Sequence, residues 1–413
     1  MTQDLITLGQ NAKKAAFELA LLSSQKKNEL LQAAADYLIS QTPTILAANQ
    51  LDLKNYQQTQ TDLKFMDRLK LDEQRIEQMA LGLRQIATLA DPLGKSQGWV
   101  NQAGLKINQV RVPLGVIGMI YEARPNVTVD AFGLCFKTGN AVILRGGKEA
   151  LNTNLCLSRL LREVLQQQQI TPDAVQIIAD PSRQIAKEFM QLQALDVLIP
   201  RGSANLIQSV VQNATVPVIE TGAGNCHIYL DKYADFTMAK EIVLNAKTQR
   251  PTVCNAAEKL LIHQDAVGCL PTLLTALFDA GVEIRGDETI CQFDSRIKLA
   301  TAKDWETEYN DYIMSLKLVK HLDEAIAHIN QYSTKHSEAI ITNDYQRSQY
   351  FLERIDSACV YVNASTRFTD GFEFGFGAEI GISTQKLHAR GPLGLNELTT
   401  TKYQILGSGQ IRQ

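Results

Sequence analysis

The sequence lacks the spacings that mark metal sites and disulfide scaffolds. None of its seven cysteines forms a Cys-x-x-Cys pair, and none of its six histidines stands in a His-Glu-x-x-His or similar metal-ligand spacing. We therefore expect no bound metal. An odd number of scattered cysteines fits reduced thiols in the cytoplasm better than a disulfide framework.

Long apolar runs and an excess of positive charge are also missing. No run approaches the ~20 residues of a membrane-spanning helix. The N-terminus has no basic region followed by an apolar core, as a signal peptide would have. The 41 basic and 44 acidic residues give a net charge of −3, which leaves no basic face. We expect neither a nucleic acid nor a membrane as a partner.

What is present is an ordinary globular composition, 45% hydrophobic and 21% charged. A length of 413 residues is too great for one core and predicts two or three domains. Residues 1–92 have helical periodicity, with Leu30, Ala34 and Leu38 on one apolar face. Residues 98–112 predict a hairpin, because two β-rich runs flank a polar turn that contains glycine.

Beyond residue 112, short apolar runs alternate with helical stretches in two blocks. The strands of the first block are predicted at 115–121, 141–145, 175–179, 196–200 and 216–220, and those of the second at 226–230, 258–263, 312–319, 338–342 and 359–363. Helices are predicted at 128–138, 149–166, 182–193, 203–213, 235–246 and 265–280. This alternation predicts an α/β fold on parallel sheets that are buried on both faces. Ligands of such sheets bind beyond the C-terminal ends of the strands.

Cys254 has the most unusual setting among the cysteines. It follows an irregular Lys-Thr-Gln-Arg-Pro segment, so that Lys247 and Arg250 lie just upstream. Nearby cations favour the thiolate, which is the form that attacks carbon. A lone cysteine is more often a buried structural residue, so the local sequence leaves both roles open.

Polar turns follow three predicted strands of the first block. Asn126 comes after Arg124-Pro125, where its amide suits either an ordinary turn or a donor to an oxyanion. Gly146-Gly147-Lys148 and Gly202-Ser203 let a ligand approach the backbone at a helix start. Each is also a plain strand-to-helix connection. Two such turns on one sheet favour an anionic cofactor, although the Gly-x-Gly-x-x-Gly fingerprint is absent after the first strand.

The order of these segments resembles the aldehyde dehydrogenase superfamily. The resemblance rests on Arg124-Pro-Asn126, Lys137–Lys148, Glu220-Thr-Gly-Ala-Gly224, Cys254 and the tail Phe374–Lys402. Within the superfamily, three long blocks resemble the glutamate-5-semialdehyde dehydrogenases, also called gamma-glutamyl phosphate reductases. These blocks are Asn245–Asn255, Cys359–Asp370 and Gly375–Pro392. The match extends from near residue 5 to about residue 407, and the long blocks are far more specific than the glycine turns.

The resemblance implies two parallel-sheet α/β domains, one for the cofactor and one catalytic, plus a β-hairpin oligomerisation element. The expected NADP-binding domain is 1–222, with the hairpin at about 98–112, and the expected catalytic domain is 223–363 with Cys254. Residues 364–413 are expected to return to the cofactor domain and to form an oligomerisation flap. The resemblance therefore implies a homo-oligomer.

The resemblance also implies roles for individual residues. Cys254 matches the nucleophile and Asn126 the asparagine of the oxyanion hole. The positions that match cofactor contacts are Arg145 at the adenosine ribose, Gly202 and Ser203 near the phosphates, and Glu308 at the nicotinamide ribose. Candidate cations for the substrate's phosphate and carboxylate are Arg124, Lys247, Arg250, Lys386, His388 and Arg390.

Two positions depart from the family's common pattern. Lys148 stands where relatives that prefer NAD tend to have glutamate. With Arg145 it would attract the 2′-phosphate of NADPH, so we expect NADPH over NADH. Glu220 matches the carboxylate that activates water for thioester hydrolysis. Because water would destroy a reductase's intermediate, a structural or positional role for Glu220 is favoured over a catalytic one.

The implied reaction is the NADPH-dependent reduction of L-glutamyl 5-phosphate to L-glutamate 5-semialdehyde and phosphate, through a Cys254 thioester. It is the second step of proline biosynthesis from glutamate, and glutamate 5-kinase is a candidate partner because it makes the unstable substrate. Three alternatives stay open: an aldehyde-oxidising or CoA-acylating dehydrogenase, a cysteine hydrolase that pairs Cys254 with a histidine, and a non-catalytic metabolite-binding protein.

Overall fold

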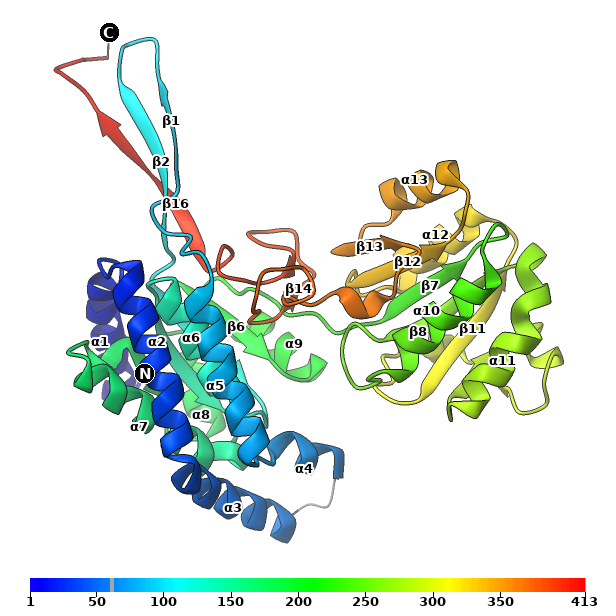
Figure 1. The fold of residues 1–413 in the computed structure, drawn as a ribbon, viewed down its shortest axis with the longest axis horizontal. Coiled ribbons are helices and arrows are strands. Elements are labelled where there is room, and N and C mark those ends of the chain that lie inside the picture. The colour runs from blue at the N-terminus through cyan, green and yellow to red at the C-terminus, as the bar shows by residue number, and fades with distance from the viewer. Residues whose placement is uncertain (60–62, 413) are drawn as a thin grey trace. The chain divides into compact units, whose positions relative to one another are not determined.

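The computed structural model describes residues 1–59 and 63–412, and the chain divides into two compact units. Unit 1 consists of Met1–Glu220, Gly375–Gly381 and Leu393–Gln413. Unit 2 consists of Thr221–Phe374 and Ile382–Pro392. Each unit has its own parallel sheet with helices on it (Figure 1).

Amphipathic helices form the N-terminal part of unit 1. They are α1 (Gln3–Leu19), α2 (Ser24–Ser40), α3 (Thr42–Thr59), α4 (Leu63–Leu69) and α5 (Glu73–Thr88). The Ser23 side chain accepts a hydrogen bond from the Lys26 amide and so caps α2. Leu30, Ala34 and Leu38 are all buried, which confirms the predicted apolar face of this helix.

The sheet of unit 1 is parallel, with the strand order β5-β4-β3-β6. Its strands are β3 (Val116–Tyr121), β4 (Ala141–Gly146), β5 (Val175–Ile177) and β6 (Val197–Arg201). The connecting helices are α6 (Asn126–Lys137), α7 (Leu151–Gln167), α8 (Arg183–Phe189) and α9 (Ala204–Asn213). β3 is buried along its whole length, as its unbroken apolar run predicts.

The strand predicted at 216–220 is reduced to a single parallel bridge between Leu198 and Val218. Pro217 explains the difference, because proline has no N–H to donate to a ladder. Its carbonyl still accepts from the Leu198 amide at 2.9 Å. The segment therefore lies along the edge of the sheet without extending it.

An antiparallel three-stranded sheet stands away from the helices of unit 1 (Figure 1). β1 (Ser96–Val100) and β2 (Lys106–Pro113) form the predicted hairpin, and β16 (Thr399–Leu406) pairs with the other side of β2. Large side chains on it are exposed, namely Trp99, Val100, Tyr403, Ile405 and Leu406. An exposed apolar sheet of this kind is typical of a surface that a partner covers.

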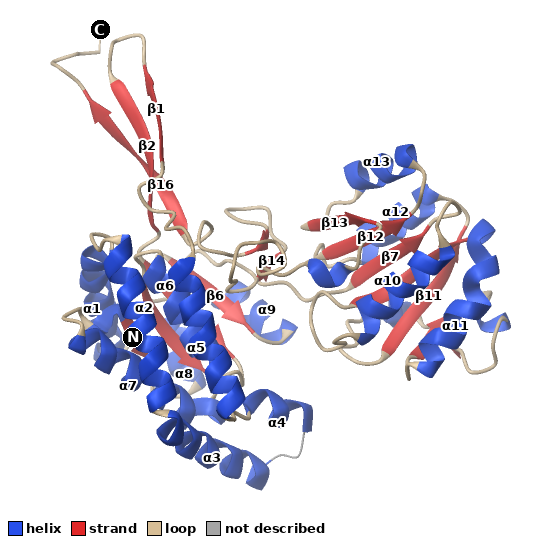
Figure 2. Ribbon diagram, in the orientation of Figure 1, coloured by secondary structure: helices blue, strands red, loops and turns tan. Residues whose placement is uncertain are grey.

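Unit 2 holds a second parallel sheet, with the strand order β10-β9-β11-β8-β7-β12-β13. The strands are β7 (Cys226–Leu230), β8 (Ala257–His263), β9 (Glu283–Gly286), β10 (Lys298–Leu299), β11 (Ile313–Val319), β12 (Ser337–Ile341) and β13 (Cys359–Val362). Helices α10 (Phe236–Thr248) and α11 (Leu270–Asp279) cover one face, and α12 (Leu322–Tyr332) and α13 (Tyr345–Arg354) cover the other (Figure 2). Two short strands, β14 (Ile382–Ser383) and β15 (Gly391–Pro392), pair with each other near the C-terminal end.

The two faces of the second sheet have separate apolar cores, which follow from the alternation of side chains along a strand. On β7, Ile228 and Leu230 pack into the core under α10 and α11, whereas Tyr229 packs into the core under α12 and α13. No helix in the described part of the chain is long and apolar enough to cross a membrane.

Candidate active site

Cys254 lies in the loop that joins α10 to β8 in unit 2. The helix ends at Thr248 and the loop begins with Arg250-Pro251, since the residue before a proline is driven out of the helical conformation. All seven cysteines are free thiols, and five of them are buried. Cys254 and Cys291 are the two that reach solvent in part. The partial exposure of Cys254 suits a thiol that must meet a substrate.

The main chain of Cys254 is packed directly against the segment that leads into β7. A Cβ atom on Gly224 would lie 1.4 Å from the Cys254 carbonyl oxygen, so only glycine fits at position 224. The Cys226 thiol donates to the same carbonyl at 3.2 Å. These contacts fix the position of the Cys254 main chain against Gly224 and Cys226.

Lys247 is buried in an ion pair rather than turned toward solvent. Its Nζ lies 2.9 Å from Glu258 Oε2, and both side chains are at most 1% exposed. Burial raises the pKa of Glu258 to about 7, and the Lys247 ammonium opposes that rise. Lys247 therefore joins α10 to β8 through a buried ion pair.

Asn255 links the Cys254 loop to a distant segment that includes the 3-10 turn Thr366–Phe368. Its side-chain amide donates to the carbonyl of Thr369 at 2.9 Å, and its own carbonyl accepts from the Thr366 hydroxyl at 2.7 Å. Arg367, in the same turn, donates through Nε to Gln249 Oε1 at 2.8 Å and through Nη1 to Asn255 Oδ1. Arg367 therefore joins residues on both sides of Cys254, although it is absent from the cations predicted from the sequence.

Two of the three predicted substrate cations in the C-terminal segment, Lys386 and Arg390, form ion pairs with Asp356. Lys386 lies 3.0 Å from Asp356 Oδ2, and Arg390 lies 3.0 Å from Asp356 Oδ1. Lys335 forms a third ion pair with it at 3.1 Å. These cations hold the pKa of Asp356 well below its usual range, with the hydrogen bond from Lys386 contributing most. His388 is exposed, with a left-handed backbone φ of 67°.

Asn126 is the first residue of α6 in unit 1, directly after the C-terminal end of β3. Its amide is exposed and donates to Asp130 Oδ2 at 2.9 Å. Burial raises the pKa of Asp130 to about 6, and Asn126 and Arg201 oppose the rise. Arg124, two residues upstream, is also exposed.

The end of β4 carries two cations with different settings. Arg145 is half-buried and donates through Nη2 to the carbonyl of Pro181 at 2.8 Å. Its Nε is buried without a hydrogen-bond partner among the described residues. Burial lowers the pKa of Arg145, while Glu149 and Asp180 raise it. Lys148 begins the 3-10 turn that leads into α7, and its side chain is exposed.

The Gly202-Ser203 turn at the end of β6 is arranged to hold an anion. The Ser203 amide and hydroxyl donate to the two oxygens of Glu122 at 2.8 and 2.9 Å. A Cβ on Gly202 would come within 2.6 Å of the same carboxylate. Ser203 also caps α9 by accepting from the Leu206 amide. A carboxylate thus occupies the place that a helix N-terminus offers to a phosphate.

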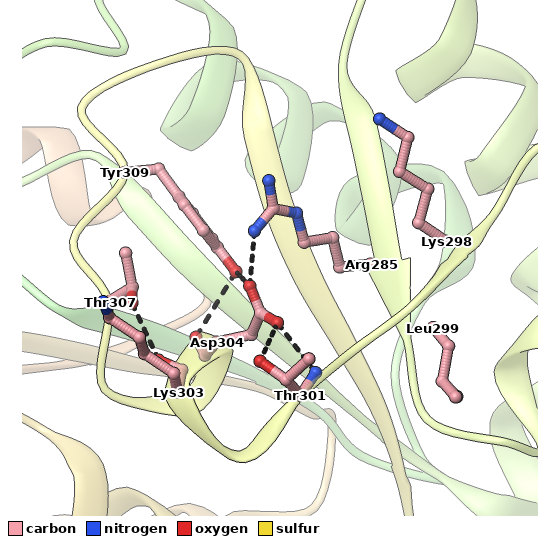
Figure 3. Close-up of a pocket in the computed structure, with 8 residues that line it drawn as sticks. All are labelled: Arg285, Lys298, Leu299, Thr301, Lys303, Asp304, Thr307 and Tyr309. Carbon is pink, nitrogen blue, oxygen red and sulfur yellow. Dashed lines mark hydrogen bonds and ion pairs between the residues drawn. The ribbon is translucent and has the colours of Figure 1, made fainter.

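Glu308 lies in the loop between β10 and β11 and accepts from the Gly224 amide at 2.8 Å. A polar pocket is lined by residues on both sides of Glu308 in the chain, among them Thr307 and Tyr309 (Figure 3). Here the Asp304 carboxylate accepts from Arg285, Tyr309 and Thr301. Although burial opposes them, these hydrogen bonds hold the pKa of Asp304 below its usual range. Within the pocket Arg285 and Asp304 form an ion pair, and Asp304 also binds Tyr309 in the loop that carries Glu308. The pocket is lined by Arg285, Lys298, Leu299, Thr301, Lys303, Asp304, Thr307 and Tyr309.

Within residues 1–59 and 63–412, no cluster of three or more His, Cys, Asp or Glu side chains could hold a metal ion. Glu220 is half-buried and is the last residue of the first segment of unit 1.

Comparison with known proteins agrees with the resemblance seen in the sequence. The profile of the aldehyde dehydrogenase family matches residues 2–280 and 304–403. The gamma-glutamyl phosphate reductase of Ligilactobacillus salivarius is 62% identical over 417 residues, covering 100% of both chains. The crystal structure of the gamma-glutamyl phosphate reductase of Thermotoga maritima superposes with a TM-score of 0.97 at 45% identity, again over 100% of both chains. An engineered glycolyl-CoA reductase with bound NADP+ shares the fold, with a TM-score of 0.70 at 15% identity over 97% of this chain and 96% of its own.

The two gamma-glutamyl phosphate reductases match over the full length of the chain, and the solved structure confirms the predicted α/β fold class. The chain belongs to the aldehyde dehydrogenase family, and within it to the gamma-glutamyl phosphate reductases.

Proposed function

We propose that this protein reduces L-glutamyl 5-phosphate to L-glutamate 5-semialdehyde and phosphate with NADPH, and that Cys254 carries the acyl group. The reaction is the second step of proline biosynthesis from glutamate. The observation that carries the proposal is the Cys254 loop, in which a partly exposed thiol is held in place by its own main chain. That loop belongs to a chain 62% identical to a gamma-glutamyl phosphate reductase.

The chemistry divides one difficult reduction into two steps. The Cys254 thiolate attacks the acyl carbon, and the C–O bond to phosphate breaks as the thioester forms. NADPH, when bound, supplies a hydride to the thioester carbon. The tetrahedral adduct on Cys254 then collapses, the C–S bond breaks, and the aldehyde and the thiolate are released. None of these reaction steps uses water, so the proposed mechanism gives Glu220 no catalytic role.

The oxyanion that develops on the acyl oxygen needs donors. The proposal assigns this role to the backbone N–H of Cys254 and to the amide of Asn126. Asn126 supports it by being exposed and by making its hydrogen bond to one neighbour, Asp130, which a substrate oxygen can replace.

The residues at the strand ends of unit 1 fit a phosphorylated dinucleotide. Arg145 has a buried Nε with no partner among the described residues, and Lys148 presents an exposed ammonium close by in sequence. Two cations suit the 2′-phosphate, which carries nearly two negative charges. Ser203, with Gly202, would hold the pyrophosphate through donors that Glu122 occupies in this structure. Glu308 is assigned to the nicotinamide ribose.

The six predicted cations differ in their fitness to hold the substrate. Arg250 is exposed beside the nucleophile in sequence, which supports a direct role. Lys247 is committed to Glu258, so its proposed contribution is the positioning of the loop. Lys386 and Arg390 surround Asp356 with an excess of positive charge, and Arg124 and His388 are exposed. These four are proposed as candidates for the α-carboxylate.

Two partnerships belong to the same proposal. The exposed apolar sheet of β1, β2 and β16 supports a homo-oligomer, because a second copy would bury it. Association with glutamate 5-kinase would shorten the path of an unstable acyl phosphate.

The decisive assay runs the reaction backward. With glutamate semialdehyde and NADP+, formation of NADPH should depend on added phosphate, and Cys254→Ala should abolish it while NADPH still binds. Cys291→Ala is the matched control, since Cys291 is the other partly exposed thiol. Turnover that needs CoA instead of phosphate would establish a CoA-acylating dehydrogenase, and retained activity in Cys254→Ala would end the proposal.

A further inference from the structure

Arg367 has the setting of an anion receptor beside Cys254. Within the described residues, its guanidinium donates side-chain hydrogen bonds to two neutral amide oxygens, those of Gln249 and Asn255. The ion pairs of the described residues do not include Arg367. A half-buried guanidinium without a carboxylate partner is unusual, because burying a charge is unfavourable unless an opposite charge compensates it.

The two acidic groups whose charges act on Arg367, Asp370 and Glu373, form no ion pair with it among the described residues. Asp370 accepts from the backbone amides of Phe372 and Glu373, which caps the following turn. Glu373 is exposed. Burial lowers the pKa of Arg367 most and the Arg250 charge lowers it further, whereas Cys254, Asp370 and Glu373 raise it. Because Arg250 and Arg367 repel each other, a bound anion would stabilise both charges.

Arg250 supplies a second cation from the loop itself. It is exposed, and none of the ion pairs of the described residues includes it. Arg250 lies on the Cys254 loop, while Arg367 is held against Gln249 and Asn255, which bracket Cys254 in the chain. Two arginines next to one nucleophile match a dianion better than they match a single carboxylate.

We propose that Arg367, together with Arg250, binds the phosphate group that leaves when Cys254 attacks the acyl phosphate, and that binds again in the reverse reaction. This inference rests on the proposed function. Phosphate is favoured over the α-carboxylate because phosphate is attached to the very carbon that the thiolate attacks, whereas the carboxylate lies at the far end of the glutamyl chain. The planar fork of arginine donates two parallel hydrogen bonds to phosphate oxygens and stabilises their growing charge.

The kinetic test uses the phosphate-dependent oxidation of glutamate semialdehyde by the full-length enzyme. In Arg367→Gln the KM for phosphate should rise at least about tenfold, while the KM for the semialdehyde stays within about twofold. Arg250→Gln should show the same pattern with a smaller rise. Arg367→Lys should recover only part of the loss, because an ammonium lacks the fork. A rise in the KM for the semialdehyde alone would overturn the proposal in favour of the α-carboxylate.

A second readout needs no turnover. Inorganic phosphate should slow the alkylation of Cys254 by iodoacetamide, followed by mass spectrometry of the peptide that contains it. The protection should vanish in Arg367→Gln and Arg250→Gln but persist in Arg354→Gln. Arg354 is a suitable control because it is an exposed arginine of α13 that stacks on Tyr350.

The two readouts separate the inference from the proposed function. If Cys254 were not the nucleophile of a phosphate-dependent reaction, the kinetic assay would fail but phosphate protection would still depend on Arg367. Arg250→Gln guards against misfolding, since no hydrogen bond of the described residues is lost with its side chain. Phosphate protection that survives in both Arg367→Gln and Arg250→Gln would refute the site.

Discussion

The two units hold their candidate residues by different means. In unit 1, Asn126, Arg145 and Ser203 stand at strand ends and make replaceable side-chain hydrogen bonds to neighbours. In unit 2, the Cys254 loop is fixed by main-chain packing on Gly224 and by the buried Lys247–Glu258 pair. The difference matches the proposed tasks, because a cofactor must bind and leave whereas a nucleophile must keep its position through every step.

Breaking the buried pair in unit 2 should have the largest effect. Lys247→Met leaves Glu258 buried without its partner, and such losses reach about 3–5 kcal/mol of unfolding free energy. Lys148→Met, which removes an exposed lysine of unit 1, should change it by less than about 0.5 kcal/mol. Urea unfolding without cofactor measures both, and equal losses would erase the contrast between the units.

The second-largest effect is expected from a side chain at position 224, which would collide with the main chain of Cys254. Gly224→Ala places a methyl group against the Cys254 carbonyl, and the resulting shift should lower kcat by about 100-fold. Gly268→Ala is the matched control, because a Cβ there meets no heavy atom within 4 Å. Steady-state rates at saturating substrate decide between them; a fully active Gly224→Ala would show that the loop is not held by this contact.

A substitution in the proposed cofactor site of unit 1 should change the preference for NADPH over NADH. Lys148→Glu puts a carboxylate beside the proposed 2′-phosphate, so the preference of kcat/KM for NADPH over NADH should fall by about tenfold or more. Stability should hardly change. Lys187→Glu reverses another exposed charge of unit 1 and should leave the preference intact. An unchanged preference in Lys148→Glu would remove Lys148 from the site.

The smallest effect is expected on how the free energy of unfolding changes with pH. All six histidines belong to unit 2, and burial lowers the pKa of His328 to about 3. The unfolded chain then binds a proton on this residue below pH ~6.5 that the folded chain does not bind. His328 by itself therefore lowers the free energy of unfolding by about 1.4 kcal/mol per pH unit as the pH drops from there. His328→Phe should remove this contribution, while that of His227, whose pKa burial also lowers to about 3, remains. Unfolding at pH 7.5, 6.5 and 5.5 compares the two proteins, and parallel curves would contradict the assignment.

The sequence was sufficient for the architecture because its strands are short unbroken apolar runs. β3, β4, β7 and β8 fall where those runs predict them. β9, α12 and α13 were not predicted, and the run containing Pro217 was predicted as a strand but forms one bridge. Proline removes a donor that an apolar pattern does not reveal.

The candidate site was harder to predict from the sequence than the fold. Separation along the chain does not show which residues contact the Cys254 loop in the structure. Lys247 is close to Cys254 in sequence, yet the turn of α10 buries it against Glu258. Arg367 is far away, yet it bonds to Asn255. Arg367 lies within the block Cys359–Asp370, on which the resemblance rests, so the sequence marked this segment. The sequence did not show that the segment contacts the Cys254 loop.

The most direct measurement of the central claim is the mass of the enzyme during a blocked turnover. Glutamate semialdehyde and NADP+ without phosphate should give one burst of NADPH per chain and a glutamyl adduct on the Cys254 peptide, which added phosphate then removes. Steady NADPH formation without phosphate, or an adduct on another cysteine, would contradict a Cys254 thioester that passes its acyl group to phosphate and hydride but not to water.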